Sequence, residues 1–338
     1  MRSTTLSHHL AHSLFAALTL SLSLASHAAG KSKGFSVEKT DTGGAVITHN
    51  GQPFATYVVD QANKPYLYPV YGPTGKMMTR NYPMKNVEGE RQDHPHHRGI
   101  NFGHEDIGGF NTWAERRSFE ELIKKRPQYA DRLKKVGNIR HKSYLVIKAD
   151  ADKAVLVTEN DYVGPDGKKA ITEIRTMTFR VETNARLIDW DQEFIATEGE
   201  VTLADRKDSG LSIRVPTSMD VDSKKGGHII TSAGITDKAA WGTRAKWVDY
   251  NGPVDGETLG VAILNHPTSF RHPTSWHVRT YGLFTANPFG TLKKDDPNGP
   301  HTLKKGDKLR LRHRFILHKG DDKQAGIAAA FERYSKEK

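Results

Sequence analysis

The sequence predicts an all-β protein, a large antiparallel β-sandwich with one or two peripheral helices. Three observations predict this class. Short stretches of alternating apolar and polar residues recur along the chain, turn-forming residues separate them, and helical periodicity is confined to a few short segments. Many short strands joined by turns are typical of an antiparallel sandwich rather than of a barrel built from strand–helix–strand units.

The clearest strand is Arg186–Ala196. Ile188 and Trp190 lie on one side of it, and Asp189 and Asp191 lie on the other. A strand with this pattern buries one face and exposes the other. Further strands are predicted at Phe35–Glu38, Ala45–His49, Tyr144–Lys148, Ala154–Tyr162, Ile171–Glu182, Leu211–Val215, Leu259–Leu264, Trp276–Thr285 and Lys308–His318.

Helical segments are few. One helix is predicted at Ser118–Lys125, an additional turn at Tyr129–Lys135, and an amphipathic helix at Lys323–Tyr334. The stretch from Pro65 to Pro83 is rich in proline, glycine and tyrosine and is predicted to be irregular. Long irregular segments in globular chains usually line a functional face or wrap the domain.

The N-terminus has the build of a secretory signal peptide. Arg2 is followed by an apolar run, Leu14–Ala25, and then by small residues, with cleavage expected after Ala28. The alternative, a membrane anchor, is disfavoured because the run is too short to cross a bilayer, and no later segment is long enough to span one. We therefore expect a signal peptide at 1–28, a single β-sandwich domain at 29–338, and a periplasmic or secreted location.

Composition narrows the possible functions. The chain has no cysteine, which excludes thiolate metal sites and cysteine nucleophiles. Its net charge of +11 comes from lysines and arginines that are spread along the chain, so nucleic acid is not the expected partner. A solvated basic surface or attraction to an anionic polysaccharide fits equally well. No Walker, Rossmann or G-x-S-x-G pattern is present, so no nucleotide cofactor is expected.

The densest polar cluster is the segment 93–105, which begins Asp-His-Pro-His-His-Arg-Gly. Histidine titrates near neutral pH, so His94, His97 and His104, together with Glu105, are candidate catalytic acids and bases. The alternative is that these histidines only hydrogen-bond the backbone of a turn rich in proline and glycine.

The same segment is also a candidate metal site. If it is extended, His94 and His96 project to one side, with His97 and Arg98 astride them. A His-x-His pair is a workable first half of a zinc or iron site that needs one or two more ligands, for which His104 and His266 are the candidates. A divalent metal ion is therefore the cofactor that this pair would bind.

A second polar segment, residues 265–290, mixes aromatic rings with histidine, arginine and asparagine. An aromatic face packs on the C–H groups of a sugar, while polar side chains bind its hydroxyl or carboxylate groups. The alternative for Trp276 is a place in the core. The candidate sugar-binding residues are Arg98, Trp113, Trp276, Arg279, Tyr281 and Asn287, and the candidate catalytic residues of this segment are His266 and His277.

A charged loop at 205–210 leads into Arg214. Lys207 or Arg214 would bind an anionic group or stabilise developing negative charge. The alternative is a loop that is only solvated.

Several motifs together resemble the PmoA-like family of exported bacterial proteins, otherwise treated as a domain of unknown function. The motifs are Tyr66–Pro73, Asp93–Gly99, Trp247–Tyr250 and Tyr281–Gly290. The resemblance spans about Phe54 to His318. The name of that family implies a methane oxygenase, and therefore a histidine-ligated, oxidative metalloenzyme.

The end of the chain, Lys305–Leu309 and Leu317–Gly320, is similar to the last strands of galactose-mutarotase-like sandwiches. That resemblance implies a sugar bound on the concave face of the sandwich, where histidines of both polar segments would meet. Three hypotheses remain open: an exported enzyme acting on a sugar or uronide by acid–base chemistry, a non-catalytic glycan-binding module, and a histidine-ligated metalloenzyme.

Overall fold

The computed structural model describes residues 33–338 and Met1. Residues 33–338 belong to one compact unit. The signal peptide expected at 1–28 lies outside the described residues, and it remains a prediction.

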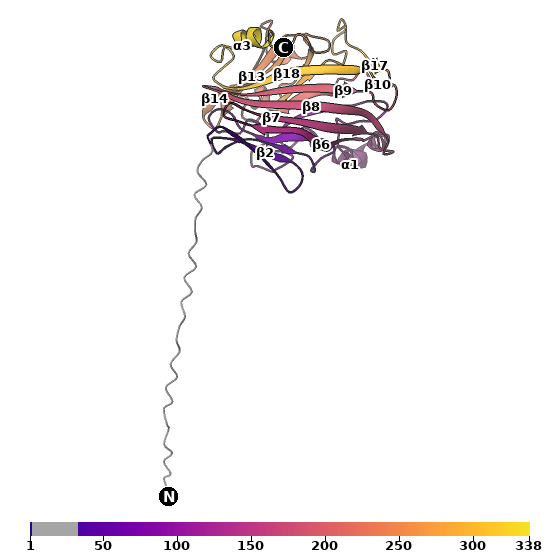
Figure 1. Ribbon diagram of the computed structural model, residues 1–338, viewed down its shortest axis with the longest axis horizontal. Coiled ribbons are helices and arrows are strands. Elements are labelled where there is room, and N and C mark those ends of the chain that lie inside the picture. Colours follow the sequence, from indigo (N-terminus) through magenta and orange to yellow (C-terminus); the bar gives the residue numbers. More distant parts are fainter. Residues whose placement is uncertain (2–32) are drawn as a thin grey trace. The chain divides into compact units, whose positions relative to one another are not determined.

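Two eight-stranded antiparallel sheets pack against each other around one hydrophobic core (Figure 1). This arrangement confirms the predicted antiparallel sandwich. The first sheet has the order β1 (Phe35–Lys39), β2 (Ala45–His49), β3 (Gln52–Val58), β4 (Tyr66–Val70), β5 (Ile100–His104), β11 (Ser209–Arg214), β16 (Leu283–Asn287), β15 (Ser275–Val278).

The second sheet and the smaller elements complete the fold. The second sheet has the order β12 (His228–Thr231), β13 (Trp247–Val254), β14 (Glu257–Asn265), β18 (Lys308–Lys319), β9 (Ala185–Ile195), β8 (Lys169–Glu182), β7 (Lys153–Val163), β6 (Asn138–Ala149). The other elements are β10 (Val201–Leu203) paired with β17 (His301–Leu303), the 3-10 turns η1 (Val221–Ser223) and η2 (Asp237–Ala240), and the helices α1 (Arg116–Lys125), α2 (Tyr129–Lys134) and α3 (Ile327–Tyr334).

The core lies between the sheets. The Phe102 ring of β5 packs on the Phe194 ring of β9 with centroids 5.0 Å apart, and Phe54 of β3 meets Phe179 of β8 edge-on at 5.5 Å. These contacts join the two sheets through the alternating residues that the sequence pattern selects. Burial of such large apolar side chains is the main stabilising contribution.

The outer face of the second sheet is charged where solvent covers it and apolar where α3 covers it. Across β9 and β18, Lys308 pairs with Glu193 at 2.8 Å, and Arg310 pairs with Asp191 at 2.9 Å. Phe331 of α3 packs in a separate apolar cluster that includes residues of β9, β14 and β18. The helix α3 and the helix α1 lie on opposite sides of the sandwich (Figure 1).

The prediction of one continuous strand at Trp276–Thr285 is wrong. The chain forms two antiparallel strands, β15 and β16, joined by a tight turn in which the Gly282 N–H donates to the Arg279 carbonyl at 3.0 Å. Gly282 has a φ of +95°, a conformation that favours glycine. Beyond Val278 the expected alternation of faces therefore breaks down.

The helices α1 and α2 form an insertion between β5 and β6. Phe119, Val136 and their neighbours build a small apolar cluster that is separate from the main core. The insertion covers part of the outer face of the first sheet. Among residues 33–338, no helix is long and apolar enough to span a membrane.

Candidate functional site

A cavity of about 530 Å³ lies between this helical insertion and the outer face of the first sheet. In β5, Ile100 and Phe102 point into the core, whereas the pocket-lining residue Trp113 packs on Gly103 from the other side. Seven of the predicted site residues line the cavity: His94, His96, His97, Glu105, Trp113, Lys207 and Tyr281. The two distant polar segments therefore meet at one pocket, although only Tyr281 of the second segment reaches it.

The histidines come from a tight turn and not from an extended strand. The His97 N–H donates to the His94 carbonyl at 2.9 Å, and His94 has a φ of +51°. The expectation that His94 and His96 project to one side of an extended segment is therefore wrong. Instead the His94 ring stacks between those of His97 and Tyr281, with centroids 4.9 and 5.1 Å away and planes within 3°.

His97 is held by Arg214, which comes from β11. The guanidinium Nη1 lies 2.8 Å from His97 Nδ1. Because a guanidinium can only donate, Nδ1 must accept, and in a neutral ring the proton sits on Nε2. Burial first, and then the neighbouring His96 and Arg214, lowers the pKa of His97 well below its usual range. His97 is therefore a neutral ring that presents an Nε2–H group.

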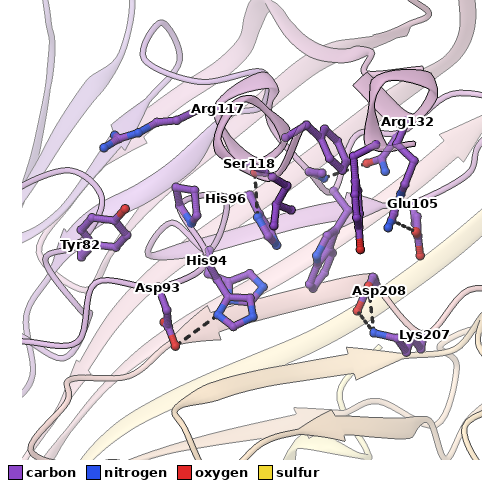
Figure 2. Close-up of a pocket in the computed structure, with 18 of the residues that line it drawn as sticks. Tyr82, Asp93, His94, His96, Glu105, Arg117, Ser118, Arg132, Lys207 and Asp208 are labelled. Carbon is purple, nitrogen blue, oxygen red and sulfur yellow. Dashed lines mark hydrogen bonds and ion pairs between the residues drawn. The ribbon is translucent and has the colours of Figure 1, made fainter. Parts of the chain in front are cut away.

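His94 has the opposite arrangement. Its Nδ1 lies 3.3 Å from Asp93 Oδ2, and an ionised carboxylate only accepts hydrogen bonds, so this contact favours the proton on Nδ1 (Figure 2). Burial opposes ionisation of Asp93, but the His94 hydrogen bond and Arg214 hold its pKa below the ordinary value. The Nε2 of a neutral His94 then carries a free lone pair. Among residues 33–338, neither His94 nor His97 has a hydrogen-bond partner at Nε2.

His96 connects the histidine turn to the helical insertion. Its Nδ1 lies 2.9 Å from the hydroxyl of Ser118, which also accepts from the Glu115 N–H at the start of α1. Burial, followed by the charge of Lys64, lowers the pKa of His96 well below its usual range. The α1 terminus thus fixes a second neutral imidazole in the wall.

Carboxylates occupy the other end of the pocket. Figure 2 shows Glu105 paired with Arg132 of α2, and Asp208 paired with Lys207, away from His94. Burial first, and then Asp208, raises the pKa of Glu105 above its ordinary value, while Arg132 opposes the rise. Glu105 therefore remains a candidate acid or base at this end.

Arg98 does not reach the pocket. Its guanidinium makes two hydrogen bonds to Glu115, at 2.7 and 2.8 Å, and packs over Tyr66. Lys64 lies 3.8 Å from the same carboxylate. The expectation that Arg98 binds substrate is corrected, because its donors are engaged in a buried ion pair.

Trp276 and His104 face the sandwich core. Trp276 has 0% exposure, and its indole N–H donates to the Ala245 carbonyl at 2.9 Å, so it offers no face to a sugar. His104 packs on Phe289 with centroids 4.9 Å apart, and its Nδ1 accepts from the Asp106 N–H. Burial lowers the pKa of His104 to about 3. Neither residue has access to the pocket, so both predictions are corrected.

His266 is remote from the pocket. Its ring nitrogens contact Thr268 and the Glu337 carbonyl, and it packs on Tyr334 of α3. Its expected convergence with the first segment is corrected, because β14 carries it to the other sheet.

Three further predicted residues contact pocket-lining residues but do not line the cavity themselves. The Asn287 amide donates to the Lys207 carbonyl at 2.9 Å, and His277 Nδ1 donates to the same carbonyl at 2.7 Å. Burial, only partly offset by Asp208, lowers the pKa of His277 to about 4. Arg279 packs over Tyr281 with its guanidinium 5.5 Å from the ring centroid. Arg214 and these three residues thus position lining residues without lining the cavity.

A metal site built on His94 and His96 would require at least one more ligand. The rings of His94 and His96 are edge to face, 5.9 Å apart. Within the described part of the chain, no group of three or more histidine or carboxylate side chains is placed to hold a metal ion.

The pocket residues that sequence reasoning missed include Tyr82, Asp93, Arg117, Arg132 and Asp208. Asp93 and Asp208 flank predicted residues, and that adjacency is a usable signal. The two arginines belong to the insertion, and only its fold brings them to the pocket.

Taken together, the fold and the site define a β-sandwich protein with a histidine-rich polar pocket. The chain belongs to a family of unknown function, DUF6807, which matches residues 44–332. No curated protein matches the sequence.

Solved structures resemble the fold at low identity. A galactose mutarotase-like protein from Clostridium acetobutylicum shares 9% identity, with 85% of this chain and 98% of that chain covered and a TM-score of 0.40. The GH36 alpha-galactosidase AgaB from Geobacillus stearothermophilus shares 10% identity over 85% of this chain, with a TM-score of 0.40, but this chain spans only 41% of its length. The heparan sulfate lyase HepC from Pedobacter heparinus shares 8% identity, with 86% of this chain and 36% of the HepC chain covered and a TM-score of 0.34.

Proposed function

We propose that this protein is an exported enzyme that acts on a sugar or uronide by proton transfer in the histidine pocket. The observation that carries the proposal is the pair of stacked imidazoles with opposite ring-nitrogen roles. Arg214 leaves His97 with an Nε2–H donor, and Asp93 leaves His94 with an Nε2 lone pair.

The two roles are chemically complementary. The lone pair of His94 takes a proton from a carbon or hydroxyl of the sugar, and His97 donates a hydrogen bond to the oxygen on which negative charge develops. A neutral imidazole donor that stabilises an oxyanion in this way is an established catalytic device. Trp113, whose ring lies 5.6 Å from His97, supplies an apolar surface beside these groups.

The test is to follow a panel of sugars, uronates and their methyl glycosides by proton NMR in D2O with the purified protein. This measurement detects bond cleavage, epimerisation and exchange of C–H for C–D together. We expect His94→Gln to lower the rate by about 10²- to 10⁴-fold, the usual contribution of a general base.

The matched control is His228→Gln. His228 has 41% side-chain exposure and lies 3.2 Å from Asp237, whereas His94 has 42% exposure and lies 3.3 Å from Asp93, but His228 is outside the pocket. Equal loss of activity in both variants would contradict the proposal. Sugar binding without any turnover would identify a glycan-binding module instead.

A further inference from the structure

We propose that the sugar bound in this pocket carries a carboxylate, and that Arg117 binds it at the histidine end of the cavity. This inference rests on the proposed function and names its substrate class.

The first observation concerns the carboxylates that line the pocket, all three of which are already neutralised by cations. Asp93 pairs with Arg91 at 2.9 Å and also with Arg214. Glu105 pairs with Arg132, and Asp208 pairs with Lys207 at 3.1 Å. The pocket therefore offers no unpaired negative charge to a cationic ligand.

The second observation is that Arg117 also lines the pocket and forms no ion pair with any carboxylate whose side chain the structure describes. Its guanidinium lies 5.9 Å from the centroid of the Tyr82 ring. Figure 2 shows Arg117 and Tyr82 on the side of Asp93 and His94, away from Glu105. Of the three lysine and arginine side chains that line the pocket, only Arg117 is thus left without a carboxylate among the described side chains. It lies at the histidine end of the pocket.

The third observation is the placement of this charge within α1. Arg116 and Arg117 occupy the first turn of the helix, which contains no acidic residue. The N-terminal end of a helix carries partial positive charge, so cations there are unfavourable by roughly 0.3–1 kcal/mol each. The partial charge of the helix terminus therefore does not by itself account for a cation at Arg117.

The buried His97, which lines the same pocket, favours an anion as well. His97 is only 4% exposed and still has an unpartnered Nε2–H group in the pocket wall. The buried cations Lys64 and Arg214 add no free charge, because Lys64 lies 3.8 Å from Glu115 and Arg214 pairs with Asp93. An anionic group between Arg117 and His97 would accept hydrogen bonds from both.

A single unpaired guanidinium balances a single negative charge and matches the planar geometry of a carboxylate. A phosphate dianion would need more cations than the pocket leaves free. The ligand chemistry that fits is therefore that of a uronate or a related sugar acid.

The test measures the affinity of the full chain for three matched probe pairs by titration calorimetry at low salt: D-glucuronate with D-glucose, D-galacturonate with D-galactose, and D-mannuronate with D-mannose. We expect at least one acid to bind about tenfold more tightly than its neutral partner, the size of one charge-assisted hydrogen bond. Arg117→Gln should abolish this preference. Arg116→Gln is the matched control, because it removes the same charge from the same helical turn but outside the pocket lining.

Three results would overturn the inference. Where binding is detected, these are equal affinity for acid and neutral sugar, a preference that survives Arg117→Gln, and stronger binding of glucose 6-phosphate than of any uronate. Each of these results leaves a sugar-binding pocket in place and therefore leaves the proposed function standing. Absence of binding by every probe also overturns the inference, and the NMR experiment then decides the proposed function separately.

Discussion

Acidification should unfold this protein at an unusually mild pH, because several histidines are buried in the neutral state. His97, His104, His277 and His313 are at most 4% exposed. Burial is the first cause of the lowered pKa of each of them, which reaches about 4 for His277 and about 3 for His104 and His313. In the unfolded chain these residues bind protons below pH ~6.5, whereas in the folded protein they do not.

The sign and size of the effect follow from proton linkage. A lowered pKa stabilises the fold above the unfolded value, and the contribution is lost as the pH falls toward the folded value. Between pH 7 and pH 5 each histidine costs about 2 kcal/mol, or about 8 kcal/mol for four. His318 acts in the opposite direction: burial lowers its pKa, but Asp249 at 2.6 Å more than offsets this and raises it. Even with this opposing contribution, a loss of several kcal/mol is comparable with the whole stability of many domains.

The assay is urea unfolding at pH 7, 6 and 5, followed by tryptophan fluorescence and far-UV circular dichroism. The variant His104→Gln should reduce the loss between pH 7 and 5 by about 2 kcal/mol, even if it lowers stability at both values. A change in unfolding free energy below about 1 kcal/mol between pH 7 and 5 would refute the reasoning. So would a full pH dependence in His104→Gln.

Two further predictions concern Gly103 and Arg98, which contact the residues around the pocket without lining it. Gly103→Ala should destabilise the protein by about 1–3 kcal/mol, because a Cβ would lie 2.9 Å from the Trp113 Cα and 3.1 Å from the Thr112 carbonyl. Thermal unfolding checks this, with Gly199→Ala, which meets nothing within 4 Å, as the control. Arg98→Met should cost about 3–5 kcal/mol, because it leaves the buried Glu115 without its main partner. Urea unfolding measures this loss, and a variant as stable as the parent protein would contradict the assignment of Arg98 to a structural ion pair.

Much of the fold could be predicted from the sequence. The alternation in β9 and β18 is a local property with a period of two residues, so it identifies strands and their buried faces without knowledge of their partners. The helices α1 and α3 begin within a few residues of the predicted positions. The histidine turn was recognised as a candidate site because its polar residues are close together in the sequence.

What the sequence could not determine was the surroundings of individual side chains. Trp276 and Arg98 matched the expected sugar-binding chemistry, but one faces the core and the other is bound by Glu115. The turn between β15 and β16 was missed because apolar and polar residues alternate through 276–285 as they would in a continuous strand.

The sequence by itself therefore determined an antiparallel sandwich and the segment that carries most of the imidazoles. Only the tertiary structure decided that His94 and His97 stack, that Asp93 and Arg214 give them opposite ring-nitrogen roles, and that Arg117 faces the same cavity. The physical reason is that strand alternation depends on neighbouring residues, whereas hydrogen-bond roles and charge balance depend on groups more than 100 positions apart, such as His97 and Arg214.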